Sequence, residues 1–276
     1  MNRPVAVILA VSMVAGCAEK KPAPEPTPPP PATPAVIDIN ATDYAFQAPD
    51  TIQGGWVTLR LHNAGRELHH AGLARLEQGK TIKDLATMGE AIPEWLVMAG
   101  GPNPAPPGGA VEATINLPPG SYVILCSIPS PDGKLHVMKG MVHPLTVTAA
   151  TVEAQPAAAD ITIKLSDYDF AITPQLTAGK HIFRVENLPG QPHELVFVRV
   201  PAGKKAEDLL GWVNKMVGPP PIEGVVGGTT PLAAGGIAVF PGELAPGDYV
   251  LICFIPDPKD GKPHAAHGMM KTIKVA

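Results

Sequence analysis

The chain has 276 residues, of which 45% are hydrophobic and 17% charged, so it is long enough for one large or two ordinary domains with buried cores. Its formal net charge of −4, with no basic cluster after the N-terminus, argues against a nucleic-acid partner. Only 5% of the residues are aromatic, whereas 34 prolines and 28 glycines favour short strands joined by turns over long helices.

The N-terminal segment has the layout of an export signal. Arg3 precedes an apolar run over residues 5–14, which is too short to span a bilayer, and the sequence VAGC ends at Cys17. The segment resembles a bacterial lipoprotein signal, because VAGC matches the lipobox. This resemblance implies that residues 1–16 are removed and that Cys17 carries the lipid. An ordinary secretory peptide with an incidental cysteine is the alternative.

A proline-rich stretch over residues 18–35 follows, with no apolar side chain that could pack. Together with Cys17 it forms the segment 17–35, which we expect to be an extended spacer between a membrane anchor and the folded body. The protein is therefore expected to be a lipid-anchored lipoprotein of the cell envelope, facing the periplasm or the outside. Ala18 resembles the outer-membrane sorting pattern of bacteria with two membranes.

The remaining sequence is an internal duplication. DYAF at residue 43 recurs as DYDF at residue 167, and a Gly before a strand, an Asn that ends it and a His six residues later recur at the same offset. PPGSYVILC and APGDYVLIC follow in the two copies. We therefore predict two domains, 36–148 and 160–276, joined by a linker over 149–159.

Short apolar runs bounded by Gly, Pro, Asn and Asp predict strands of about 5 to 8 residues in each copy. YVILCSI and YVLICFI are apolar on both faces and predict central strands, so the expected fold is all-β, a sandwich or barrel in each copy. Helical spacing of Leu, Trp and Met predicts one short helical insertion per copy, over 79–99 and 203–217. Trp95 and Trp212 are expected to pack against the strands.

Each copy also carries a set of side chains typical of a metal site. One histidine comes from an upstream strand, and a cysteine, a histidine and a methionine come from one loop. Two imidazoles and a thiolate with a weak axial thioether favour copper that cycles between two oxidation states. The candidate ligands are His69, Cys126, His136 and Met141 in the first copy and His193, Cys253, His264 and Met269 in the second.

Other interpretations of single residues remain open. A buried cysteine is often only a small apolar side chain, and a buried methionine is often a core residue. In the second loop His267 competes with His264, and Met270 competes with Met269. Strand alternation directs His70 away from His69, which makes it a surface residue or one that supports the ligands from outside.

The ligand pattern resembles that of the cupredoxin family of type 1, or blue, copper proteins. HVMKGM and HAAHGM keep the family's spacing of His and Met, and the long Cys-to-His loops are similar to those of two-domain copper nitrite reductases. The resemblance covers about residues 43 to 275. It implies two tandem cupredoxin-like Greek-key sandwiches, each with one type 1 copper.

The same resemblance bears on activity. Copper nitrite reductases and multicopper oxidases place a histidine directly before the loop cysteine, but Leu125 and Ile252 stand there, and the chain has no His-x-His pair. The resemblance therefore implies one-electron transfer with redox protein partners and no enzymatic activity. The alternatives are a copper buffer or chaperone, a non-redox module that binds only proteins, and an oxidase or reductase whose catalytic copper lies between subunits.

Overall fold

The computed structural model describes residues 32–87, 92–213, 215 and 220–276. The predicted signal, Cys17 and the spacer up to residue 31 lie outside this part of the chain. Residues 31–276 belong to one compact unit. Within the described ranges, no helix is both long and apolar enough to cross a membrane.

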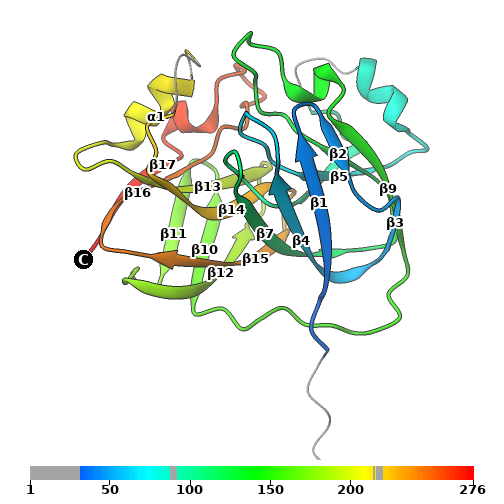
Figure 1. The fold of residues 1–276 in the computed structure, drawn as a ribbon, viewed down its shortest axis with the longest axis horizontal. Helices are drawn as coiled ribbons and strands as arrows, with labels where there is room; N and C mark the ends of the chain where they lie inside the picture. The colour runs from blue at the N-terminus through cyan, green and yellow to red at the C-terminus, as the bar shows by residue number, and fades with distance from the viewer. Residues whose placement is uncertain (1–31, 88–91, 214, 216–219) are drawn as a thin grey trace, which may run out of the picture. The chain divides into compact units, whose positions relative to one another are not determined.

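The described residues form two sheets, and both halves of the sequence contribute strands to each (Figure 1). The first sheet has the order β11 (Asp169–Thr173), β10 (Ile161–Ser166), β12 (Gly179–Asn187), β15 (Ile237–Leu244), β7 (Ala110–Leu117), β4 (Gly55–Asn63), β1 (Ala35–Thr42) and β2 (Ala45–Gln47). The second has the order β17 (Met270–Val275), β16 (Gly247–Ile252), β13 (His193–Val200), β14 (Gly224–Leu232), β6 (Leu96–Gly100), β5 (Gly72–Leu76), β8 (Gly120–Leu125), β9 (Val142–Thr148) and β3 (Thr51–Gln53).

The predicted all-β fold with cupredoxin-like sandwiches is confirmed, and the two sandwiches share their sheets. β7 of the first half pairs with β15 of the second, with Ile115 opposite Ala238, and β6 pairs with β14 through Ala99 and Leu232. A strand at the edge of a sheet has backbone N–H and C=O groups without hydrogen-bond partners. Pairing β7 with β15 and β6 with β14 gives such groups partners in the other half. The domain boundaries deduced from the duplication stay a prediction.

Among the described residues, the helical insertions are shorter than the sequence suggested. The first is a 3₁₀ turn, η1 (Ile82–Thr87), and the second is the helix α1 (Ala206–Val213). The prediction of helix up to residue 99 was wrong, because residues 96–100 pair with β5 as a strand and this tertiary pairing overrides helical spacing. Trp95 and Trp212 are partly buried against the apolar clusters on the second sheet, as expected.

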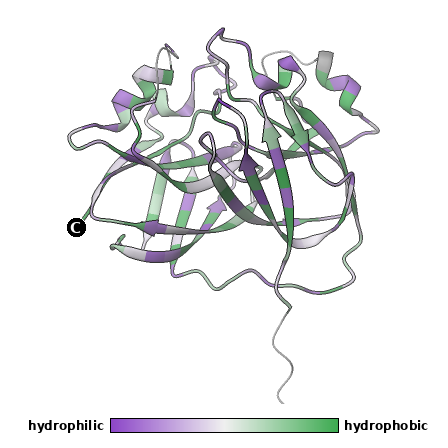
Figure 2. Ribbon diagram, viewed as in Figure 1, coloured by the Kyte–Doolittle hydropathy of each residue, from purple (hydrophilic) through white to green (hydrophobic). Residues whose placement is uncertain are grey.

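One apolar core runs through both halves between the sheets. Its members include Leu59 and Ile115 from the first half and Phe183 and Phe240 from the second, all fully buried. The rings of Phe183 and Phe240 stack with their centroids 5.1 Å apart. Figure 2 shows hydrophobic residues recurring along the strands, with hydrophilic residues between them. The sandwich therefore gives a rigid frame to the loops that carry the candidate ligands.

Candidate metal centres

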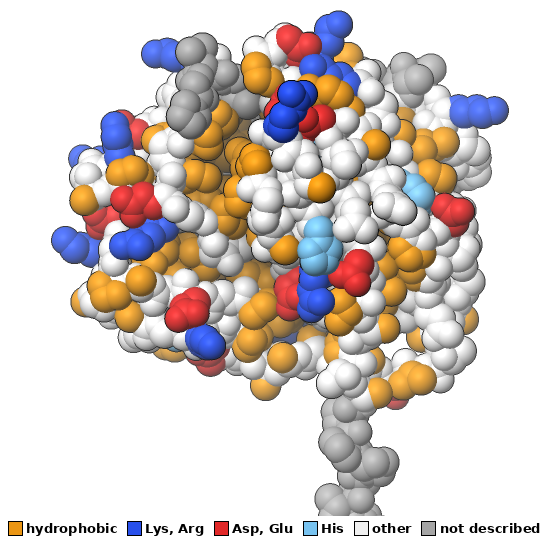
Figure 3. Space-filling model, in the orientation of Figure 1, with side chains coloured by type: hydrophobic (Ala, Val, Ile, Leu, Met, Phe, Trp, Pro, Cys, Tyr) orange, Lys and Arg blue, Asp and Glu red, His pale blue; other side chains and the backbone are white. Residues whose placement is uncertain are grey.

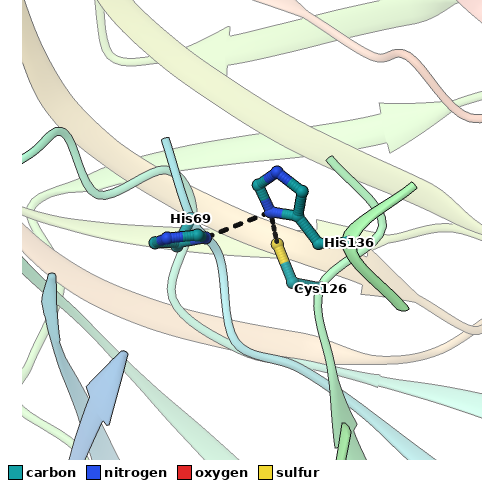
Figure 4. Close-up of side chains that lie close together, drawn as sticks. All are labelled: His69, Cys126 and His136. Atoms are coloured by element: carbon teal, nitrogen blue, oxygen red, sulfur yellow. Dashed lines mark hydrogen bonds between the residues drawn. The ribbon is translucent and has the colours of Figure 1, made fainter. Parts of the chain in front are cut away.

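In each half the structure brings together three of the four predicted ligands. The groups are His69, Cys126 and His136 in the first half and His193, Cys253 and His264 in the second. The ligand atoms of each group lie within 4.8 Å of one another, and all six side chains are fully buried. Figure 4 shows the first group, in which the two rings and the sulfur face a common centre. We call these two sets of three side chains the first and the second metal group.

The two groups have nearly the same geometry. In the first, the Nδ1 atoms of His69 and His136 are 3.1 Å apart, and the Cys126 Sγ lies 3.4 Å from the His136 Nδ1. In the second, the corresponding distances are 3.0 and 3.6 Å. The duplication therefore extends from the sequence to the positions of the donor atoms.

Backbone hydrogen bonds hold the ligand loop of the first half in place. The amide of His136 donates to the Ile128 carbonyl at 3.0 Å, and the amide of Val137 donates to the Cys126 carbonyl at 2.7 Å. Gly140, with φ of 98°, ends the short turn η2 (His136–Lys139), because this left-handed conformation suits glycine. The second loop repeats these bonds around η3 (His264–His267).

The two methionines are fixed next to the groups by the same loops. The Met141 amide donates to the His136 carbonyl at 3.0 Å, and the Cys126 amide donates to the Met141 carbonyl at 3.3 Å. Met269 makes the same pair of bonds in the second half, and both side chains are fully buried. Their role as axial ligands stays a prediction.

The competing residues of the second loop lie elsewhere. His267 is exposed, with its Nε2 atom 3.1 Å from Asp260, and Met270 begins strand β17 and is only partly buried. His264 is the histidine that meets His193 and Cys253.

The outward Nε2 atom of each grouped histidine meets an oxygen acceptor. In the first half, His69 lies 3.2 Å from Asp43 and His136 lies 2.9 Å from Glu67. A carboxylate can only accept, so each Nε2 carries the proton and each Nδ1 turns a lone pair toward the centre. In the second half the acceptors are Asp167, at 3.0 Å from His193, and Gln191, at 3.2 Å from His264.

This arrangement fits a copper ion. Two imidazole lone pairs about 3 Å apart repel one another, and a buried sulfur faces them. A cation at the centre removes this conflict, and two nitrogens with one thiolate are the donors of a blue copper site. The expected copper cofactor is thus supported by a donor group in each half that could hold it.

Burial sets the protonation states in the first metal group. Burial raises the pKa of the Cys126 thiol to about 12 and lowers the pKa of His69, so the imidazole is neutral at pH 7. Burial opposes the ionisation of Asp43, but hydrogen bonds from Arg66, Glu67 and His69 outweigh it and lower the pKa to about 2. A metal ion that binds here takes a thiolate and releases the thiol proton.

Sequence reasoning missed the residues that orient the histidines. Asp43 and Asp167 belong to the repeated Asp-Tyr opening that revealed the duplication, but no role was deduced for them. Glu67 and Gln191 stand two residues before the upstream histidine in each copy. A side chain that can accept a hydrogen bond, two residues before the upstream histidine in both copies, was the sequence feature that could have identified them.

For His70 the second of the two alternatives, a residue that supports the ligands from outside, agrees with the structure, because His70 and its counterpart Glu194 are both buried. The backbone amide of each donates to the cysteine sulfur of its own half at 3.5 Å. The His70 Nε2 accepts from the amide of Ser127 at 2.8 Å, and the Glu194 Oε1 accepts from the amide of Phe254 at 2.9 Å. Each side chain thereby fixes the residue that follows the ligand cysteine.

A cavity of about 860 Å³ lies beside the first metal group. Its walls are mainly apolar and come from β5, β6, η1 and the first ligand loop, with Thr230, Pro231, Ile255 and Pro256 of the second half; His70, Ser127 and Thr230 are the polar members. None of the grouped ligands is among its described lining residues. The cavity therefore does not open directly onto a metal centre.

No protein-family model and no curated protein matches this sequence. Among solved structures, the chain is similar to auracyanin from Roseiflexus castenholzii, with 21% identity over 42% of this chain and 99% of that one and a TM-score of 0.30. It is similar to a blue copper oxidase from Nitrosomonas europaea, with 15% identity over 87% of this chain and 86% of that one and a TM-score of 0.27. A copper-containing nitrite reductase from Thermus scotoductus matches with 12% identity over 87% of this chain and 61% of that one, with a TM-score of 0.23.

These likenesses agree with the cupredoxin resemblance inferred from the motifs, which is confirmed. At such low TM-scores, the case for copper rests on the two ligand groups of the chain itself. The expectation that the chain is not an enzyme is contradicted by the same matches, because they include an oxidase and a nitrite reductase, each aligned with 87% of this chain.

Proposed function

We propose that the protein is an exported, lipid-anchored copper protein that carries single electrons between redox partners, with one copper in each half. The observation that supports this most directly is the repeated, fully buried group of two Nδ1 atoms and one sulfur. Copper held by this donor set cycles between Cu(I) and Cu(II). The proposed ligands are His69, Cys126, His136, Met141, His193, Cys253, His264 and Met269.

The surroundings of the groups suit this function. Carboxylate and amide acceptors fix the orientation of the four rings, and the loop backbone fixes the sulfur and the methionine. A site held in one geometry and kept from water needs little rearrangement when its charge changes by one unit. The protein thus supplies rigidity and a dry setting, which suit rapid electron exchange.

Export and anchoring are proposed from the lipobox at Cys17 and the spacer after it. The partners are proposed to be redox proteins, met at the surface of the membrane. On the face shown in Figure 3, Lys and Arg side chains are scattered among Asp, Glu and hydrophobic residues. This face therefore lacks the large field of one sign that steers strongly charged partners.

Adding Cu(II) to the purified mature chain tests the proposal. We expect a strong visible copper–thiolate absorption that saturates at two copper ions per chain, is lost on one-electron reduction and returns on oxidation. A protein that stays colourless with Cu(II) but binds Cu(I) tightly would instead be a copper buffer or chaperone. If neither Cu(I) nor Cu(II) binds, copper is not the cofactor of this protein.

The reduction potentials of the two groups should differ. Glu67 bonds the second histidine of the first half, whereas neutral Gln191 bonds that of the second. A carboxylate makes the imidazole a stronger donor and favours Cu(II), so the first group should have the lower potential. Glu67→Gln should raise the reduction potential of the first group, by about 59 mV for each tenfold loss of affinity for Cu(II) relative to Cu(I).

A redox titration that follows the copper–thiolate absorption measures this shift. Gln191→Glu is the matched reciprocal variant and should lower the potential of the second group. Unchanged potentials in both variants would contradict the role given to these acceptors.

A further inference from the structure

The cavity of about 860 Å³ beside the first metal group has the size of a small-molecule site. It extends from the buried Leu73 and Ala74 of β5 to Met138 of the first ligand loop, which is 74% exposed. Its described lining residues include no Lys, Arg, Asp or Glu, and no Phe, Tyr or Trp. The cavity therefore offers aliphatic walls and no side chain that would neutralise a carboxylate or a cation.

The two halves differ at this place because of their inserted segments. Ile82 and Leu85 of η1 line the cavity and are only partly buried. The duplication sets Ala206 and Leu209 of α1 against them, and these two side chains are buried in one apolar cluster with strands β13 and β16. In the second half the insertion thus packs onto the sheet, whereas in the first half it leaves the cavity.

The strand beneath the insertion differs in the same direction. Ala74 of β5 lines the cavity, and its counterpart in the second half is Val198, which packs in the cluster with α1. The smaller side chain leaves more room in the first half. The space therefore arises from differences between the two copies at several positions.

One polar group in the wall lacks a partner. Thr230 of β14 is 0% exposed, and its Oγ1 has no hydrogen-bond partner among the described residues. Its backbone is satisfied, because its amide donates to the Gly101 carbonyl at 2.9 Å and its carbonyl accepts from the Thr229 hydroxyl at 3.0 Å. Leaving a buried hydroxyl unpaired lowers stability. Since Thr230 lines the cavity, a bound molecule can supply the missing partner.

We propose that this cavity binds an uncharged aliphatic molecule with one terminal oxygen, of the class of long-chain alcohols, and that this oxygen pairs with the Thr230 hydroxyl. The aliphatic walls suit a flexible chain, and the side chains of Met98 and Met138 can adapt to its shape. A carboxylate end is disfavoured, because it would be buried without a cation. Binding involves no chemical step and does not depend on copper.

Titrating 1-decanol into the copper-free mature chain, below the solubility limit of the alcohol, tests the proposal by calorimetry. We expect binding that saturates at one molecule per chain and a melting temperature that rises with decanol concentration. Decanoate at pH 7 has the same chain length and a charged end. It should bind at least about tenfold more weakly.

Thr230→Val removes the hydroxyl and nearly keeps the shape of the side chain. It should weaken decanol binding about fivefold, while the melting temperature without ligand stays at or above that of the wild type. Thr229→Val is the matched control. Thr229 is equally buried on the same strand but is not among the described lining residues, so its substitution should leave the affinity for decanol unchanged.

Ala74→Val gives the first half the residue of the second and should weaken decanol binding about tenfold by narrowing the cavity. This variant decides the question if Thr230→Val does not unfold cooperatively, and wild-type affinity in Ala74→Val would then overturn the inference. So would the absence of saturable decanol binding to the wild type, equal affinities for decanol and decanoate, or wild-type affinity in folded Thr230→Val. Every measurement uses copper-free protein, so this inference and the proposed function can fail separately.

Discussion

Replacing Cys126 with serine is expected to abolish the copper–thiolate absorption of the first metal group and leave that of the second intact. The thiolate is the source of the visible band, and a serine hydroxyl at this buried position is not a ligand for Cu(II) at neutral pH. Cys253→Ser should remove only the other band. A Cu(II) titration of each variant, followed by absorbance, should saturate at half the wild-type intensity or near it.

The protein that carries both Cys126→Ser and Cys253→Ser is the control for the two single variants. It should bind Cu(II) without visible colour, while its copper-free form still unfolds in one cooperative transition. Both cysteines lie in the core, and serine keeps nearly their volume there. Colour that survives in the double variant would show that the absorbing copper has other ligands.

Replacing Asn63 with alanine is expected to produce the second large effect, a loss of about 2 to 4 kcal/mol in the free energy of unfolding. Asn63 is 2% exposed and ends β4. Its Nδ2 donates to the carbonyls of Glu67 and Ala105 at 2.8 and 2.9 Å, and its Oδ1 accepts from the Gly65 amide at 2.8 Å. Alanine leaves the Glu67 carbonyl and the Gly65 amide without this partner, and the Ala105 carbonyl keeps only its bond from the His69 amide.

The substitution should also weaken copper binding at the first group, because the segment that Asn63 ties down carries Glu67 and His69. Denaturant unfolding of the copper-free protein gives the stability, and a competitive titration gives the affinity. Asn116→Ala, on the exposed face of the neighbouring strand β7, is the matched control and should change stability by less than about 0.5 kcal/mol. Equal effects of the two variants would contradict the role given to Asn63.

The metal groups could be predicted because their signal is local and repeated. The loop cysteine, histidine and methionine are close in sequence, and the upstream histidine stands at the same offset in both copies. Short apolar runs likewise predicted the strands, because burial of one or both faces leaves a direct trace in the sequence.

Features that depend on distant contacts could not be predicted. Asn103 sits in a loop rich in proline and glycine, and its partner Glu194 is 91 residues away. The shared sheets depend on edge strands meeting across the halves, which the pattern within a strand does not encode. Residues 96–100 resemble a helix in spacing, and only their pairing with β5 makes them a strand.

X-ray absorption at the copper edge of the protein loaded with two Cu(II) ions identifies the ligand atoms of both metal groups. We expect one short copper–sulfur bond and two copper–imidazole bonds per copper, averaged over both groups. The short copper–sulfur scattering per copper should fall to about half when only Cys126 or only Cys253 remains, because the copper in the substituted group has no thiolate ligand. A shell of oxygen and nitrogen alone in the wild type would show that neither cysteine binds copper.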